Sequence, residues 1–375
     1  MFAHDRVSLT ERISEESAAV ERECRFTLLR IGHLRNIAAL EIEPEGFNLI
    51  VGPNGSGKSS ILEGIYLLVR GHSFRERSLN PIVMRGCEKV NLFGRLIRDG
   101  RRIDLGVEKS PEGTLLKRNG ENVRRLSEIA QEAPLLIHTP QSVDILDREP
   151  EQRRRLVDWG VFHVEHSYRE TASRYQRALS QRNAALKSRL SRDAAIWEEE
   201  LASSGERMEK ARIGFVGELL GQFTTLIQDK GLLADVSFHW QQGWALDEPL
   251  QKTLARTRER DLERGFTQLG PHRSDIVFSC GNALARRVLS RGQKKLLLFF
   301  LQMAQAAIIV KKHQCSPVLL LDDISSELDA VSRGRIAKCL EDYPGQRFVT
   351  ALSADPLFLS ASPRMFHVEH GCLVR

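Results

Sequence analysis

A glycine-rich segment near the N-terminal end carries the strongest chemical signal in the chain. Residues 52–59 read Gly-Pro-Asn-Gly-Ser-Gly-Lys-Ser and fit the pattern G-x-x-x-x-G-K-[ST] at all four fixed positions. Glycines let backbone N–H groups turn toward a polyphosphate, and a helix that starts after such a loop adds a favourable field. Lys58 would reach the β- and γ-phosphates, and the Ser59 hydroxyl would bind Mg²⁺. The residues predicted to bind a nucleoside triphosphate are Gly52, Asn54, Gly55, Ser56, Gly57, Lys58, Ser59 and Ser60.

Two adjacent carboxylates follow a short apolar run much later in the chain. Residues 318–321 are all aliphatic, and Asp322 and Asp323 come directly after them. A buried strand that ends in two unpaired carboxylates is costly in a fold without a metal. We predict that Asp322 binds Mg²⁺, directly or through water, and that Asp323 orients or deprotonates the attacking water.

Residues 289–293, Leu-Ser-Arg-Gly-Gln, resemble the Leu-Ser-Gly-Gly-Gln signature of ATP-binding-cassette (ABC) ATPases, with Arg291 in place of the first glycine. A helix cap at Ser290 accounts for the same residues about as well. The position favours the signature, because Ser290 lies 32 residues before Asp322, which leaves room for one helix and one strand. The segment Ser326–Asp329 likewise resembles the D-loop of that family.

In ABC ATPases the signature contacts the γ-phosphate that the other subunit holds. The resemblance therefore implies an ATP-dependent homodimer. The residues of this chain that would complete the site of the other copy are Ser290, Gly292 and Gln293.

The elements that must position these residues follow from hydrophobic patterns. Apolar runs separated by turn residues predict strands over 26–31, 38–42 and 47–51, and a helix over 60–70. Alternation between residues 90 and 125 predicts an antiparallel meander with turns at Asp99-Gly100 and Asn119-Gly120. Further along, one helix and three strands are predicted, over 292–310, 318–321, 347–350 and 364–368.

The order of these elements predicts the domain organisation. Residues 151–264 are charged, helix-forming and nearly free of proline, which indicates a helical region. We therefore predict an α/β fold whose chain leaves the α/β lobe, builds a helical lobe and returns. The discontinuous α/β lobe takes residues 26–140 and 300–375, and the helical lobe takes 141–299. Residues 1–25 are expected to form a disordered extension or to precede the true start.

Composition places the chain among soluble globular proteins. Of its 375 residues 41% are hydrophobic and 28% are charged, which excludes wholesale disorder and any fibrous class. The longest apolar stretch, 296–310, is too short and too polar to span a bilayer. Six cysteines occur without a Cys-x-x-Cys pair, so neither a disulfide framework nor a zinc site is indicated. We expect a reduced, cytoplasmic protein.

Positive charge is concentrated in one part of the predicted helical lobe. Residues 148–189 contain ten Lys or Arg and five Asp or Glu, and the whole chain has a net charge of +6. On a helical wheel Arg174, Arg177, Arg182 and Arg189 fall within about 140° of arc. This face is either a solvated helix surface or a surface that contacts DNA phosphates without reading sequence. The DNA-binding candidates are Arg153, Arg154, Arg155, Arg174, Arg177, Arg182 and Arg189.

Two other patterns carry weaker signals. The sequence His-Val-Glu-His occurs at 163–166 and again at 367–370, but no third ligand cluster accompanies either copy, so we interpret both as coincidence. Residues 270–273, Gly-Pro-His-Arg, are interpreted as a structural turn, with a role in DNA or nucleotide contact left open.

Taken together, these segments resemble the RecF family of bacterial recombination mediators, which is related to SMC-type ATPase heads. The resemblance runs from about Phe26 to the C-terminus and includes the further blocks 34–36, 62–66, 153–160, 181–186 and 270–273. It implies an ABC-type ATPase head with an antiparallel β subdomain and no long coiled coil. It also implies that Arg35 and Asn36 belong to the nucleotide site. Gln141 stands where family members usually carry Glu, and it could serve as a Q-loop magnesium ligand.

The resemblance also implies an activity and partners. It implies ATP-dependent binding to single-stranded, double-stranded and gapped DNA, weak DNA-stimulated ATP hydrolysis, and partnership with RecR and RecO in loading RecA. The alternative is the ATPase subunit of a membrane transporter, but Thr350 or Ser353 stands where transporter ATPases carry their switch histidine. An SMC structural protein would need long heptad repeats between Lys58 and Ser290, and none are present.

Overall fold

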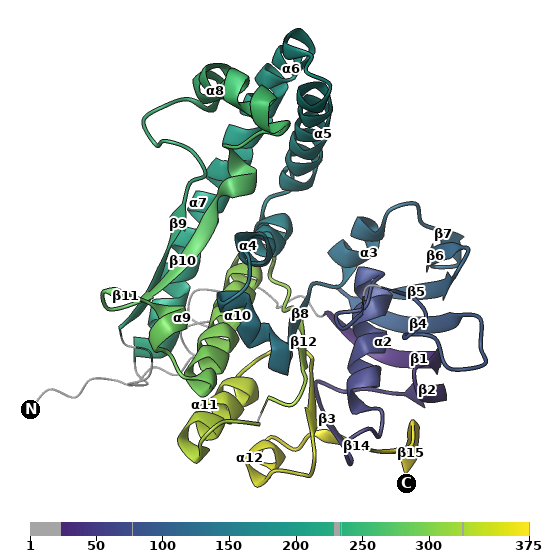
Figure 1. Cartoon of the computed structure of the whole chain (residues 1–375). Helices are drawn as coiled ribbons and strands as arrows, with labels where there is room; N and C mark the ends of the chain where they lie inside the picture. The colour runs from purple at the N-terminus through teal and green to yellow at the C-terminus, as the bar shows by residue number, and fades with distance from the viewer. Residues whose placement is uncertain (1–23, 77, 229–232, 234, 325, 375) are drawn as a thin grey trace, which may run out of the picture. The chain divides into compact units, whose positions relative to one another are not determined.

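The computed structural model describes residues 24–374 except 77, 229–232, 234 and 325 (Figure 1). The extension predicted for residues 1–25 lies outside the described residues except for its last two positions. The described residues form two compact units, one within 24–140 and 309–374 and the other within 141–308. The second unit ends at residue 308, nine residues after the boundary predicted at 299. One continuous helix, α10 (Arg291–His313), contains both positions, so no break in the chain marks the boundary.

The first unit contains a sheet that is fully buried in its central strands. Its order is β15-β14-β3-β13-β12-β8, and all neighbouring pairs are parallel except β14 with β15. The strands are β3 (Phe47–Val51), β8 (Leu135–His138), β12 (Val318–Leu321), β13 (Arg347–Ala351), β14 (Arg364–Glu369) and β15 (Cys372–Val374). Continuous apolar runs such as 318–321 are typical of parallel strands that are covered on both faces. Because β3 and β12 flank β13 in parallel, their carboxyl ends meet at one edge of the sheet.

A second sheet of the same unit is antiparallel, with the order β2-β1-β4-β5-β6-β7. Its strands are β1 (Cys24–Leu34), β2 (Ile37–Ile42), β4 (Val90–Arg98), β5 (Arg101–Ser110), β6 (Gly113–Arg118) and β7 (Glu121–Asn122). The predicted meander is confirmed, and both of its predicted turns have two residues with positive φ, at Asp99-Gly100 and at Asn119-Gly120. Such turns match the right-handed twist of the strands that they join.

Helix α2 (Lys58–Arg70) packs against strands of both sheets (Figure 1). Close approach requires glycine on it: a Cβ atom at Gly64 would lie 2.7 Å from Ile31 Cδ1. The apolar face of α2 joins the two sheets in one core that includes Ile61, Ile65 and Leu68. In the described part of this unit, further helices are α3 (Leu126–Glu132), α11 (Ala330–Glu341) and α12 (Pro356–Leu359).

The second unit is mainly helical. Its helices are η1 (Pro140–Leu146), α4 (Pro150–Val164), α5 (Tyr168–Lys187), α6 (Ser191–Ile196), α7 (Glu198–Gln228), α8 (Leu250–Arg264), η2 (Pro271–Arg273), α9 (Ala285–Val288) and α10. The predicted helical region 151–264 also contains a strand that the sequence analysis did not predict, β9 (Val236–Gln241). It pairs with β10 (Asp275–Cys280), which in turn pairs with β11 (Ala283–Leu284). Burial alternates along the first residues of β9, as in a half-buried strand.

Among the described residues, α10 is the only helix long and apolar enough to cross a membrane. However, 67% of its most apolar window is buried inside the protein, as in the core helix of a soluble protein.

Candidate nucleotide-binding site

The glycine-rich loop lies between β3 and α2, where the sequence predicted it. Gly52 and Gly57 have φ values of 158° and 116°, and a Cβ atom at Gly52 would lie 2.2 Å from the Val368 carbonyl oxygen. The Lys58 ammonium group donates hydrogen bonds to the carbonyl oxygens of Gly52 (2.6 Å) and Pro53 (2.8 Å). Burial lowers the pKa of Lys58, and the nearby charges of the two aspartates after β12 oppose that shift. The cation therefore lies over its own loop, within the site that would hold phosphates.

The carboxylate of Asp322 joins the loop to the sheet. The Ser59 hydroxyl donates to Asp322 Oδ1 at 2.8 Å, although the two residues are 263 positions apart. Thr350 Oγ1 donates to the same oxygen at 2.8 Å and accepts from the backbone N–H of Asp323 at 2.9 Å. Hydroxyl and carboxylate oxygens are the ligands that Mg²⁺ prefers, so this set of atoms fits a magnesium ion bound with a nucleotide.

Sequence reasoning did not place Thr350 at the site, because it named Thr350 only as one of two residues that stand where transporter ATPases carry their switch histidine. The structure gives it a specific task, because its side chain orients Asp322 and the backbone of Asp323 at once. Asp323 has a φ of 48°, a left-handed conformation that is unusual for a residue other than glycine. The hydrogen bond from Asp323 N to Thr350 fixes the backbone at this position.

Ser56 supplies further support for an anion in the loop. Its side chain is 3% exposed, and its hydroxyl has no hydrogen-bond partner within the described part of the chain. Buried hydroxyl groups are nearly always paired, so an unpaired one in a loop of this sequence points to a missing partner. A phosphate oxygen is an acceptor that would satisfy it.

Asn36 and Arg35 have different roles at this site. Asn36 Nδ2 donates to the Gly55 carbonyl oxygen (3.2 Å), and Asn36 Oδ1 accepts from the Ser60 hydroxyl (3.2 Å). Arg35 directs Nε and Nη2 to the carboxylate of Glu63 and Nη1 to the Pro81 carbonyl oxygen. All three guanidinium nitrogens thus donate to protein groups. The expected contact of Arg35 with the nucleotide remains a prediction.

The signature-like residues belong to the second unit, and their geometry there is that of a helix cap. The Ser290 hydroxyl accepts from the backbone N–H of Gln293 (3.3 Å), and Gln293 Oε1 accepts from the N–H of Ser290 (2.9 Å). This reciprocal pair is a capping box at the start of α10. The predicted contacts of Ser290, Gly292 and Gln293 with a nucleotide, and the predicted magnesium role of Gln141, remain predictions.

Two of the DNA-binding candidates are buried in ion pairs. Arg182 is 0% exposed and binds Asp261 (2.8 Å) and Glu198 (3.0 Å). Arg153 is 8% exposed and forms a two-bond pair with Asp275 at 2.8 and 2.7 Å. The expectation that Arg182 lies on an exposed basic face is therefore wrong, and Arg153, the other candidate, is buried on α4. An arc of 140° on α5 is wide enough to include the side that packs against α7 and α8.

The other candidates are more accessible, but they differ in how their charge is balanced. Arg154 is half-buried and donates to the Ser274 carbonyl oxygen (2.8 Å). Arg155 pairs with Glu151 (2.5 Å), and Arg174 forms a two-bond pair with Glu200 (2.8 Å for both). In the described part of the chain, two exposed candidates have no carboxylate partner, and these are Arg177 and Arg189.

The Gly-Pro-His-Arg segment is a structural turn in the second unit. His272 Nε2 bonds to the Thr267 carbonyl oxygen (2.9 Å), and Nδ1 bonds to the Tyr175 hydroxyl (2.7 Å). Burial lowers the pKa of His272 to about 4. For the His-Val-Glu-His pairs, no group of three or more His, Cys, Asp or Glu side chains that could hold a metal is found among the described residues.

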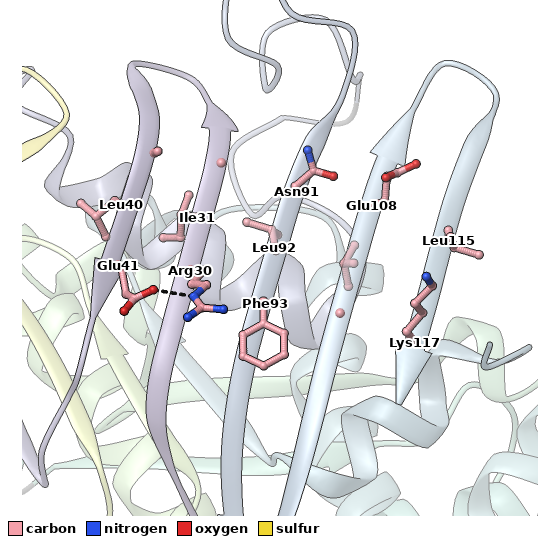
Figure 2. Close-up of a pocket in the computed structure, with 14 residues that line it drawn as sticks. Arg30, Ile31, Leu40, Glu41, Asn91, Leu92, Phe93, Glu108, Leu115 and Lys117 are labelled. Carbon is pink, nitrogen blue, oxygen red and sulfur yellow. Dashed lines mark hydrogen bonds and ion pairs between the residues drawn. The ribbon is translucent and has the colours of Figure 1, made fainter. Parts of the chain in front are cut away.

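A groove of about 670 Å³ lies away from the nucleotide loop, on the open face of the antiparallel sheet (Figure 2). Arg30 pairs with Glu41 across it (2.5 Å), and the guanidinium groups of Arg30 and Arg95 lie 5.6 and 5.9 Å from the centre of the Phe93 ring. Most charged side chains of the groove therefore already have partners of opposite charge or an aromatic ring within the sheet. None of the residues that line the groove belongs to the nucleotide site described above.

The sequence of this chain is similar to one family model and to proteins of known name. The family model described as RecF/RecN/SMC N terminal domain matches residues 26–371. The chain is 37% identical over 351 residues to the DNA replication and repair protein RecF of Thioalkalivibrio sulfidiphilus, covering 92% of this chain and 98% of that protein. It is 35% identical to RecF of Vibrio vulnificus, with the same coverage.

Solved structures give the same result. The chain superimposes on the recombination mediator protein RecF-ATP of the RecFOR pathway with a TM-score of 0.85 and 25% identity, covering 94% of this chain and 99% of that one. An Smc head domain from Pyrococcus furiosus matches with a TM-score of 0.57 at 16% identity, which shows the shared fold.

A buried parallel sheet that carries a phosphate-binding loop and Asp322 at one edge, with an antiparallel sheet packed on the same helix, defines an ABC-type ATPase head of the RecF and SMC class. Within that class, the extent of the sequence match decides the family. The chain belongs to the RecF family.

Proposed function

We propose that this protein is an ATP-dependent DNA-binding protein of recombinational repair and replication-fork maintenance. It dimerises on ATP, binds gapped DNA at junctions of single and double strands, and helps RecO and RecR to load RecA in the cytoplasm. The observation that carries the proposal is the hydrogen bond between Ser59 and Asp322, which unites the phosphate-binding loop and the catalytic strand in a chain of the RecF family.

The chemistry assigned to ATP follows from the residues at the site. Bound ATP would bring its phosphates to the loop amides, and Mg²⁺ would be held by Ser59 and Asp322, with Gln141 as a further ligand. Lys58 would exchange its two carbonyl partners for phosphate oxygens, because a charged acceptor binds an ammonium more strongly than a carbonyl does. Asp323 would orient the attacking water, which supports ATP hydrolysis. We propose that this hydrolysis is weak and stimulated by DNA, as the family resemblance implies.

The DNA surface that we propose is the exposed face of α5. From Thr171 to Arg192 the sequence has no Asp or Glu, so no acidic side chain of this stretch repels phosphates. Arg177, Lys187 and Arg189 are exposed there and have no carboxylate partner among the described residues. Free cations of this kind give contacts that depend on salt and not on base sequence.

The central test is a gel shift on gapped DNA with ATP, with ADP and with no nucleotide. We expect retention to require ATP, and sedimentation to show a dimer only in the ATP sample. Lys58→Ala should abolish both effects, because the cation that neutralises the β- and γ-phosphates is lost. Equal DNA retention in all three nucleotide states would contradict the proposal.

The DNA surface has its own matched pair of variants on one helix. Arg177→Gln removes an unpaired exposed charge, whereas Arg174→Gln removes a charge that Glu200 already balances. We expect Arg177→Gln to weaken DNA binding and to reduce the salt dependence by about one counterion. Arg174→Gln should have the smaller effect. Equal effects would show that the DNA path does not follow the unpaired cations of α5.

A further inference from the structure

Two turns from opposite ends of the sequence meet at the phosphate-binding loop. The first joins β1 to β2 and contains Arg35 and Asn36, and the second joins β14 to β15 and contains Gly371. Both turns contact backbone atoms of the loop, at Gly55 and Ser56. Neither contact involves a group that would itself touch the phosphates, so these turns act on the shape of the loop.

The first turn is held by a buried carboxylate. The Glu63 side chain is 0% exposed and accepts two hydrogen bonds from Arg35, at 2.6 and 2.9 Å, and one from the Ser73 hydroxyl. The hydrogen bond to Glu63 raises the pKa of Arg35. Arg35 has a φ of 53°, a conformation that costs an L-residue about 1–2 kcal/mol, so it needs such support.

Asn36, which follows Arg35 in the first turn, links this turn to the loop. Its amide nitrogen donates to Gly55 in the loop, and its amide oxygen accepts from Ser60 in the first turn of α2. A side-chain amide is well suited to this position because it supplies a donor and an acceptor at once. The loop and the helix that follows it are thus joined through one side chain whose backbone is fixed next to Arg35.

The second turn reaches both Asn36 and the loop. The backbone N–H of Gly371 donates to the Ser56 carbonyl oxygen at 2.7 Å. Gly371 has a φ of 78°, and a Cβ atom there would lie 2.1 Å from the Asn36 carbonyl oxygen, which is a backbone atom and cannot rotate away. Only glycine fits this contact without displacing one of the two turns.

We propose that Glu63 and Gly371 are positioning residues that hold the phosphate-binding loop in its binding conformation before the nucleotide arrives. Glu63 acts through Asn36, and Gly371 acts directly on Ser56 while it packs against Asn36. A loop with three glycines among residues 52–59 loses much conformational freedom when it orders, and a preformed loop avoids that loss on binding. The inference rests on the proposed ATP site, but the shape of the free loop can be measured without ATP.

The test begins with the nucleotide-free protein. In Glu63→Gln one oxygen of the carboxylate becomes a donor, so the two-bond pair with Arg35 cannot form. We expect amide hydrogen exchange over residues 52–58 to rise about tenfold and affinity for a fluorescent ATP analogue to fall about tenfold, which corresponds to about 1.4 kcal/mol. The matched control is Glu108→Gln, which breaks the exposed pair with Lys89 in the same unit and should change neither value.

A double-mutant cycle separates positioning from a general loss of stability. If Glu63 acts through Asn36, then Glu63→Gln should weaken ATP binding much less in a protein that already carries Asn36→Ala. Additive effects would overturn the proposed route. Gly371→Ala is the second variant, and it keeps the proposal testable if Glu63→Gln does not fold; it should also raise exchange over 52–58.

The hydrogen-exchange measurement and the ATP-binding measurement test different claims. Unchanged exchange over residues 52–58 in both Glu63→Gln and Gly371→Ala would overturn the inference, whatever the protein binds. A wild-type protein that binds no ATP would instead contradict the proposed function, and the exchange measurement would still decide the inference.

Discussion

At the scale of single residues, Asp322 and Asp323 are adjacent but differ in their surroundings. The side chain of Asp322 is buried and accepts from Ser59 and Thr350 through one oxygen. The backbone N–H of Asp323 donates to Thr350, which fixes the backbone there. Asp323 itself is only half-buried. The first aspartate is therefore placed to hold a metal beside the loop, and the second is placed nearer to solvent.

These surroundings predict different effects of substitution. Asp323→Asn should leave ATP binding intact and slow hydrolysis by about 10²-fold or more, trapping the protein on DNA. Asp322→Ala should weaken binding that depends on Mg²⁺, because it removes a ligand and leaves two hydroxyl groups without their acceptor. Titration with a fluorescent ATP analogue, with and without Mg²⁺, and single-turnover hydrolysis measure the two effects. An identical loss of ATP binding in both variants would refute this division of roles.

At the scale of elements, the basic helix α5 has two faces with different uses. Its buried face carries Arg182, whose charge is balanced by Glu198 from α7 and Asp261 from α8. Removing one partner from a buried ion pair costs about 3–5 kcal/mol, so a change at Arg182 would report on folding and not on DNA affinity. Its exposed face carries the cations that are free to meet phosphates.

The turn around His272 predicts a pH dependence of stability in the same unit. The Thr267 carbonyl oxygen can only accept, so Nε2 of His272 carries the proton and Nδ1 accepts from Tyr175. The folded pKa of about 4 lies below the ordinary value of 6.5, and the unfolded chain therefore binds the additional proton first. Stability from this group is complete above pH 6.5 and is lost as the pH falls toward 4, by up to about 1.4 kcal/mol per pH unit.

Urea unfolding of the wild type and of His272→Gln at pH 7.5, 6 and 5 checks this prediction. The variant is expected to be less stable at pH 7.5, since it loses hydrogen bonds, but its stability should fall less steeply with decreasing pH. The remaining histidines are the same in both proteins, so their contribution cancels. Parallel pH profiles would mean that His272 titrates normally in the folded protein.

At the scale of the whole molecule, the proposed dimer requires that the signature of one copy serve the nucleotide of the other. Within one chain Ser290 caps α10, and the same hydroxyl is the group that the resemblance to ABC ATPases assigns to the γ-phosphate. A cap and a phosphate ligand are compatible, because the N-terminus of a helix favours an anion.

Mixing two inactive variants tests this arrangement. Ser290→Arg places a bulky side chain where the phosphate should meet a hydroxyl, so monomeric ATP binding should persist while ATP-induced dimerisation and hydrolysis are lost. A heterodimer with Lys58→Ala contains one site with both defects and one with neither, so hydrolysis should return on mixing. Loss of a cap costs about 1 kcal/mol, so thermal unfolding of Ser290→Arg is the control. No rescue in heterodimers that demonstrably form would exclude a shared site.

The sequence by itself determined the parts of this protein that depend on local patterns. The glycine-rich loop, the apolar run before Asp322 and the helix that begins at Arg291 were all predictable, because spacing and hydrophobic period encode them within about twenty residues. The motifs alone assigned Lys58 and Asp322 to one nucleotide site, and in the fold the parallel order of β3, β13 and β12 brings their strands together.

Only the tertiary structure decided which partners these residues have. Helical periodicity places Arg182 near Arg189 on a wheel, but the acids that bury Arg182 come from α7 and α8, and a wheel contains neither. The ion pair of Arg35 with Glu63 was likewise not predictable, because it depends on the packing of α2 beside β1. Gly371 touches the loop from more than 300 residues away. Contacts of this kind arise from packing between distant segments, and no local pattern of residues records them.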